Sequence, residues 1–132
     1  GYDNREWLLR MDAEFKLIAK TDLNAASEAI TSHIGRPRLF QRDGGFYLLG
    51  RNWIEKGVMQ LALFKFDPQT LAITRHVVLD NAEKKPVADG YYAQAYWTEQ
   101  QGRTGFHVIT YKSGAKKVPE ILRLEFDWEA VK

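Results

Sequence analysis

Apolar and polar residues alternate with a period of two along most of this chain, a pattern typical of β-strands. The pattern predicts seven consecutive strands, at about 36–41, 46–52, 59–66, 72–79, 91–98, 105–112 and 120–127. Two shorter strands are expected ahead of them, at about 6–12 and 14–20. Residues 59–66 are apolar on both alternating sides, so this strand is expected to be buried on both faces. The chain is therefore predicted to be all-β.

Turn residues separate these segments. Asp43-Gly44-Gly45 is a strong hairpin signal between 36–41 and 46–52. Pro68, in Asp67-Pro68-Gln69-Thr70, stands where a turn tolerates proline and a central strand does not. The remaining stretch, 22–33, is the one plausible helix, capped by Asp22 or Asn24, and a long loop is the alternative there.

Two short phrases recur in the sequence at one offset. The segment Phe46–Arg51 is similar to Phe106–Tyr111, and Phe64–Asp67 is similar to Leu124–Asp127; in each pair the second segment lies 60 residues after the first. A third copy of the second phrase, Leu9–Asp12, lies 55 residues before Phe64–Asp67. A repeat of this length indicates a stacked or radial architecture.

Four antiparallel strands in each radially repeated unit are typical of β-propeller blades. On this interpretation residues 1–32 are the end of one blade and a connecting loop, and residues 33–85 are a complete blade. Residues 86–132 are then a blade that lacks its outer strand. The predicted fold is an incomplete β-propeller of antiparallel four-stranded blades, and a β-sandwich is the alternative.

An open arc of blades leaves an apolar blade face in water at each end. At about 25 cal/mol per Å² of apolar surface, two such faces cost on the order of 10 kcal/mol. That figure is comparable with the whole stability of a domain, about 5–15 kcal/mol. We therefore expect the partner of these faces to be either further copies of the chain or the remainder of a longer propeller.

Composition narrows the classes of partner. The 132 residues carry 19 basic and 17 acidic side chains, a net charge of +2 that favours neither nucleic acid nor a membrane surface. Cysteine is absent, and the three histidines share no ligand spacing, so neither a metal site nor a cofactor is predicted.

Arginine and aromatic residues gather near the ends of the predicted strands. Arg36 stands between Gly35 and Pro37, which favour an extended, exposed backbone there. Arginine holds carboxylates in a bidentate manner, and tyrosine and tryptophan offer flat faces to sugars. The candidate substrate-binding residues are Arg36, Arg38, Arg51, Asn52, Trp53, Asp89 and Trp97, beside Tyr91 and Tyr92. A salt bridge to a neighbouring strand is the alternative for Arg51, and a place among the core aromatics is the alternative for Tyr92, Tyr96 and Trp97.

These phrases resemble one known family. Gly35–Leu39, Asp43–Gly45 and Tyr47–Arg51 look like an inner hairpin of the sialidase-like, BNR-repeat propellers. Asp89–Tyr92 with Gly105–Tyr111 is similar to a late blade of that family, although no Asp-box of the Ser-x-Asp-x-Gly-x-x-Trp type is present.

The resemblance implies the C-terminal blades of a glycoside hydrolase that acts on sialic acids. It implies that Arg36 binds the substrate carboxylate and that Tyr91 or Tyr92 falls near the position of the catalytic nucleophile. It also implies an extracellular or periplasmic location. The predicted function is a pocket lined by arginine and tyrosine that binds or hydrolyses an acidic sugar. The alternatives are a propeller module without catalysis, serving structure or protein interaction, and a five-bladed relative acting on neutral sugars.

Overall fold

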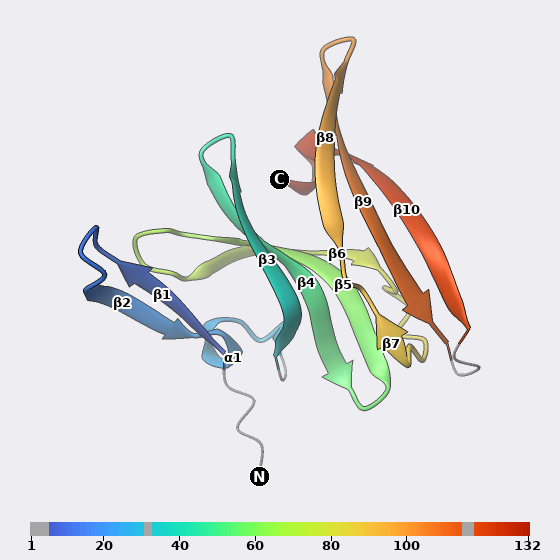
Figure 1. The fold of residues 1–132 in the computed structure, drawn as a ribbon, viewed down its shortest axis with the longest axis horizontal. Helices are drawn as coiled ribbons and strands as arrows, with labels where there is room; N and C mark the ends of the chain where they lie inside the picture. The colour runs from blue at the N-terminus through green and yellow to red at the C-terminus, as the bar shows by residue number, and fades with distance from the viewer. Residues whose placement is uncertain (1–5, 31–32, 115–117) are drawn as a thin grey trace.

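The structure, a computed structural model, describes residues 6–30, 33–114 and 118–132. Within these ranges the chain is all-β, with three antiparallel sheets of two to four strands, none of which closes into a barrel (Figure 1). The first sheet is the hairpin of β1 (Trp7–Met11) and β2 (Leu17–Asp22). The second holds β3 (Ile34–Arg42), β4 (Gly45–Glu55), β5 (Val58–Phe66) and β6 (Ile73–Asp80). The third holds β7 (Asp89–Gly90), β8 (Gln94–Gln100), β9 (Arg103–Ser113) and β10 (Pro119–Asp127).

The central sheet runs in the order β3-β4-β5-β6, so each strand pairs with its neighbour in sequence. Its four strands confirm the predicted segments to within a few residues. The predicted turn at Asp43-Gly44-Gly45 joins β3 to β4, and both Asp43 and Gly44 have positive φ angles, of 50° and 77°. Such angles suit a tight hairpin turn, because they match the twist of the flanking strands.

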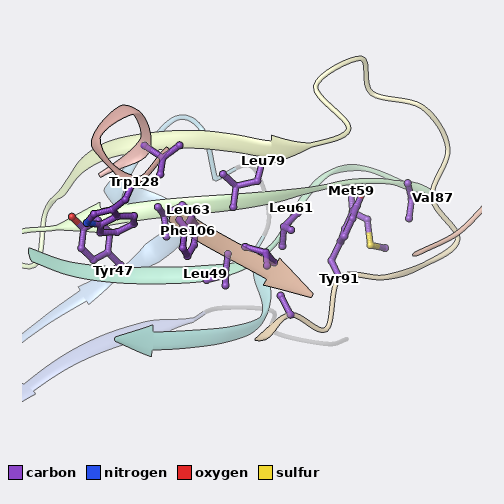
Figure 2. Packing of buried hydrophobic residues seen from close by; sticks show 13 residues of the cluster. Tyr47, Leu49, Met59, Leu61, Leu63, Leu79, Val87, Tyr91, Phe106 and Trp128 are labelled. Atoms are coloured by element: carbon purple, nitrogen blue, oxygen red, sulfur yellow. The ribbon is translucent and has the colours of Figure 1, made fainter. Parts of the chain in front are cut away.

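Both faces of the central sheet are buried, as the pattern of residues 59–66 predicts. Leu49, Leu61 and Leu63 face the third sheet and pack with Phe106 and Val108 of β9 (Figure 2). The alternate residues of the same strands belong to a second cluster with the first hairpin and the segment after it: Leu48, Ala62, Phe64, Leu8, Leu23 and Ile30. The central sheet is thus the middle layer between two others.

The third sheet differs from the prediction at its first strand. Instead of one strand at 91–98, β7 and β8 pair with the same edge of β9, and residues 91–93 interrupt them. Tyr91 lies in this break with a φ angle of 63°, which is uncommon for a residue other than glycine. β9 and β10 confirm the predicted hairpin of 105–112 and 120–127.

A short helix closes the third sheet. α2 (Trp128–Val131) begins at Asp127, whose side chain accepts a hydrogen bond from the Glu129 amide. Trp128 is fully buried, and its ring centroid lies 5.1 Å from the ring centroids of Tyr47 and Phe106. Its indole N–H donates to Asp43 Oδ2 at 3.0 Å. Trp128 therefore ties the third sheet to the β3–β4 turn of the second.

The first hairpin is present, but its second strand does not have the predicted ends. Its second strand lies at 17–22 rather than 14–20, because the turn after Asp12 is longer than expected. The predicted helix at 22–33 is one turn only, α1 (Leu23–Ala26), and its cap is Asp22, one of the two candidates. Ser27 returns to extended backbone and ends it, and residues 31 and 32 lie outside the described part. No helix among the described residues has the length and apolar character needed to cross a membrane.

Candidate functional site

A groove runs between β3 and β8, the first long strands of the second and third sheets. One part of it, about 280 Å³, is lined by Arg36, Pro37, Arg38, Tyr92 and Ala93. The adjoining part, about 390 Å³, also touches Pro37 and Arg38 and extends to Trp97. Because the two parts share residues, we treat them as one surface, the inner groove.

The backbone departs from regular strand geometry at the same place in both sheets. In β3 the pairing with β4 shifts by one residue between Gly35 and Arg38, a β-bulge, and Arg36 there has a φ angle of 51°. In the third sheet, Tyr91 occupies the corresponding break with a φ of 63°. A bulge re-aims the side chains beside it. Here the two breaks leave Arg36 and Tyr92 exposed at the groove.

Arg36, Arg51, Tyr92 and Tyr111 form one contiguous group, which we call the Arg–Tyr cluster. The guanidinium carbon of Arg36 lies 4.6 Å from the Tyr92 ring centroid, and that of Arg51 lies 5.3 Å from it. Tyr92 also stacks on Tyr111, with ring centroids 5.7 Å apart and planes within 7° of parallel. Two guanidinium groups are thus held against one pair of stacked rings.

Arg51 is the anchored member of the cluster. Its Nη1 donates to Asp89 Oδ1 at 3.3 Å and to the Gly90 carbonyl at 3.2 Å, and its side chain is 15% exposed. This arrangement needs glycine at position 35, because a Cβ there would lie 2.3 Å from Arg51 Nε. The alternative interpretation of Arg51, a salt bridge to another strand, is therefore correct, and the salt bridge to Asp89 of β7 leaves the guanidinium in the cluster.

Trp53 and His33 continue the cluster away from the groove. Their rings stack with centroids 5.6 Å apart, and Arg51 lies 5.8 Å from the Trp53 ring. Burial lowers the pKa of His33, and the positive charge of Arg51 adds to the effect. At neutral pH this imidazole is therefore uncharged.

Positive charge dominates the groove. Arg36 and Arg38 line it, and Arg51 lies behind it against the Tyr92 ring. Asp89 forms an ion pair with Arg51. Arg38 uses its Nε to donate to the Ala93 carbonyl at 2.6 Å, which links β3 to the start of β8. Neither Arg36 nor Arg38 forms an ion pair with another described residue. Their remaining N–H groups are available to an anion.

The two candidate nucleophiles separate in the structure. Tyr92 is 37% exposed at the groove, whereas Tyr91 is fully buried and donates its hydroxyl to Asp80 Oδ2 at 2.6 Å. Lys112 Nζ binds the same oxygen at 2.9 Å. Burial raises the pKa of Tyr91, and the hydrogen bond and charge of Asp80 raise it further. Tyr91 is an internal anchor of the β7–β8 break, out of reach of a ligand.

Two other candidates lie outside the Arg–Tyr cluster. Asn52 is fully buried in β4, where its Nδ2 donates to the Ala29 carbonyl at 2.7 Å. Trp97 lines the far end of the inner groove but packs into the core, as its alternative interpretation has it, with ring centroids 5.1 Å from Phe40 and 5.3 Å from Phe106. Asn52 joins the central sheet to the segment after α1, and Trp97 joins the third sheet to the second.

Tyr111 and His33 belong to the site but are absent from the candidates derived from the sequence. Tyr111 lies 60 residues after Arg51, so the repeat itself places it at the corresponding position of the next sheet. Among the described residues, no group of three or more His, Asp or Glu side chains is placed to hold a metal ion. No family model, curated protein or solved structure matches this chain.

Proposed function

We propose that the inner groove binds an acidic sugar, with its carboxylate on Arg36 and Arg51. The observation that carries this proposal is the placement of Arg36. The Arg36 side chain is exposed, has no carboxylate partner among the described residues, and lies over the Tyr92 ring. An arginine that rests on an aromatic ring loses less side-chain entropy on binding a carboxylate than an arginine without such a contact.

The shape and lining of the groove support a sugar rather than a bare inorganic anion. Its two parts, about 280 and 390 Å³, fall in the size range of small-molecule sites. Apolar surfaces of Pro37, Ala93 and Trp97 alternate there with the arginines. Sugars present such mixed surfaces, with C–H groups on one face and hydroxyls at the edges.

We further propose that the three sheets are successive units of an open propeller arc. The central sheet packs on both faces, whereas a two-sheet sandwich buries one face of each sheet. A similar turn, one residue longer at Asp67 than at Asp12, also recurs. Asp12 and Asp67 each accept amide hydrogen bonds from the residue two positions later, at 2.8 and 2.7 Å. Phe15 and Leu71 follow them with φ angles of 62° and 63°.

Binding, rather than hydrolysis, is the activity that we assign to these residues. A tyrosine nucleophile needs a neighbouring base that accepts its proton. Of the two candidate nucleophiles, Tyr91 is the one that contacts a carboxylate, and it is buried, with its hydroxyl on an Asp80 oxygen that also binds Lys112. Tyr92 has guanidinium groups against its ring.

A matched pair of ligands tests the proposal. The methyl α-glycoside of N-acetylneuraminic acid and its methyl ester differ only in the charge of the carboxyl group. Isothermal titration calorimetry at low salt should show saturable binding of the acid and binding at least about tenfold weaker for the ester, since a charged hydrogen-bonded pair is worth about 1.5–3 kcal/mol. Equal binding of both, or binding of neither, would refute an acidic-sugar site.

A further inference from the structure

Strand β1 has one edge that no other described strand pairs with, which we call its free edge. Two backbone hydrogen bonds flank β1: the Asp12 amide donates to the Lys16 carbonyl, and the Glu6 carbonyl accepts from the Leu23 amide. The backbone groups of Glu6 and Asp12 therefore point toward β2. Hydrogen bonding alternates along an antiparallel strand. Leu8 and Arg10 therefore share the β2 side, and Leu9 and Met11 direct their N–H and C=O groups to the other side. Within the described residues, β1 pairs with β2 alone.

An apolar groove of about 340 Å³ follows this free edge. Its walls are the β1 residues 8–11 and, across from them, Leu39, Phe46, Phe66, Pro68 and Leu71. Leu9, Met11 and Leu39 are exposed by 51%, 45% and 58%. The groove is continuous with an existing interface, because Leu8, Phe66 and Leu71 also belong to the core between the first hairpin and the central sheet. We call it the edge groove.

The internal repeat indicates what fits this groove. The matching turns at Asp12 and Asp67 make β1 the counterpart of β5. In the central sheet, β5 lies between β6 and β4, and its Phe66 and Phe64 pair with Phe46 and Leu48 of β4. The counterparts of Phe66 and Phe64 in β1 are Met11 and Leu9. The edge groove therefore occupies the place that a strand like β4 would take.

We propose that the free edge of β1 docks the inner β-hairpin of a further copy of the repeat, of the kind that residues 34–55 form here. The first docked strand pairs antiparallel with β1 through the backbone of Leu9 and Met11, as β4 pairs with β5. Its apolar side chains fill the edge groove against Leu39 and Phe46. This is strand addition, in which backbone hydrogen bonds give affinity and side-chain pockets give specificity. It is independent of the sugar site proposed above.

Amide exchange measured by NMR tests the docking. The probe is a synthetic peptide with the sequence of residues 34–55, added to the whole chain. We expect it to slow exchange of the Leu9 and Met11 amides at least about tenfold at saturation, because each gains a hydrogen bond. The Leu8 and Arg10 amides, already bonded to β2, should change little and act as internal references.

Three variants make the test specific. Leu9→Pro removes an edge N–H that β2 does not use, so it should abolish protection at Met11 while Leu8 and Arg10 stay protected. Leu39→Lys, across the groove, should weaken docking without changing β1. Phe15→Asn removes an apolar side chain that is 81% exposed but lies outside the groove, and should leave docking intact.

Each of the opposite results would overturn the proposal. One is unchanged exchange at Leu9 and Met11 with the peptide in large excess. Another is docking that survives both Leu9→Pro and Leu39→Lys. The third is protection of these amides in the chain alone, rising with its concentration together with a dimeric mass by light scattering. The occupant would then be a folded second copy of this chain, whose β4 is already paired with β3 and β5 and cannot dock in the proposed way.

Discussion

The guanidinium of Arg36 lies over the ring of Tyr92, 4.6 Å from its centroid, across the boundary between two sheets. Arg36 comes from a bulge in β3, and Tyr92 from the break between β7 and β8. A cation over an aromatic face contributes about 0.5–1 kcal/mol at an exposed site. That energy is small, so the contact matters chiefly because it orients an arginine that is otherwise free to bind an anion.

Replacing Arg36 should reduce binding of the acidic sugar. Arg36→Ala should weaken binding of the sialoside by about tenfold or more, the loss of one charged hydrogen-bonding partner. The affinity of Arg36→Lys should lie between those of the parent chain and of Arg36→Ala. Lysine keeps the charge, but it has neither the forked set of donors nor the stacking on Tyr92. Titration calorimetry measures both. Arg103→Ala, at the exposed β8–β9 turn, is the matched control, and an equal loss there would mean that only overall charge matters.

Substitutions of Tyr91 and of Tyr92 should differ in their effect on stability. Tyr91→Phe removes a buried donor to Asp80 and should lower the free energy of unfolding by about 1–2 kcal/mol. Tyr92→Phe removes an exposed hydroxyl and should leave stability within about 0.5 kcal/mol. Urea unfolding followed by tryptophan fluorescence measures the difference. Equal effects of the two substitutions would contradict the anchoring role of Tyr91.

The repeated turns should tolerate asparagine and not alanine. Asp67 Oδ1 accepts from the Gln69 and Thr70 amides, and Asp12 Oδ1 accepts from those of Glu14 and Lys16. Asp67→Ala should cost about 1 kcal/mol of stability, and Asp67→Asn much less, because the amide oxygen still accepts. The denaturant midpoints of Asp12→Ala and Asp12→Asn should follow the same order, with the alanine variant the less stable of the two. If alanine and asparagine are equivalent at both positions, the turns are not held by these side chains.

Stability should fall on mild acidification. Burial lowers the pKa of His33 and of His76 below the ordinary value of 6.5, with Arg51 adding to the effect at His33. The folded chain therefore binds fewer protons than the unfolded chain as the pH falls through that value, so the free energy of unfolding decreases there. Urea unfolding at several pH values from about 7.5 to 5.5 measures this dependence.

The double variant His33→Asn/His76→Asn is the control for the pH dependence, and it should lose most of the slope. Burial raises the pKa of Glu6, so protonation of Glu6 favours the folded chain and acts in the opposite direction at lower pH. A slope in the double variant equal to that of the parent chain would assign the effect to other groups.

The strands and their order could be predicted from the sequence because period-two patterning and turn residues are local signals. The positions of β4, β5, β9 and β10 follow from them. The prediction fails where the chain breaks that period. An extra residue at 91–93 reverses the alternation, so the pattern alone does not say which of Tyr91 and Tyr92 faces the core.

The sequence could likewise place part of the candidate site and not the rest. Arg36, Arg51, Trp53, Asp89 and Tyr92 lie in or against one cluster, because turns and strand ends of adjacent sheets meet there. Asn52 does not, because it alternates with Arg51 along β4 and faces the opposite side of the sheet. Tyr111 was accessible to prediction through its repeat partner Arg51. Its stacking on Tyr92 depends on the register of two strands, which a single sequence does not specify.

The most direct test of the acidic-sugar site is NMR of the arginine side chains. Galacturonate and galactose differ at one carbon, which is a carboxylate in the first and a hydroxymethyl group in the second. Titration with galacturonate should shift the Nε–Hε resonances of Arg36 and Arg51 in a saturable manner and leave that of Arg103 unchanged, while galactose shifts none of them. Equal shifts with both sugars, or unchanged Arg36 and Arg51 resonances with galacturonate, would contradict the account.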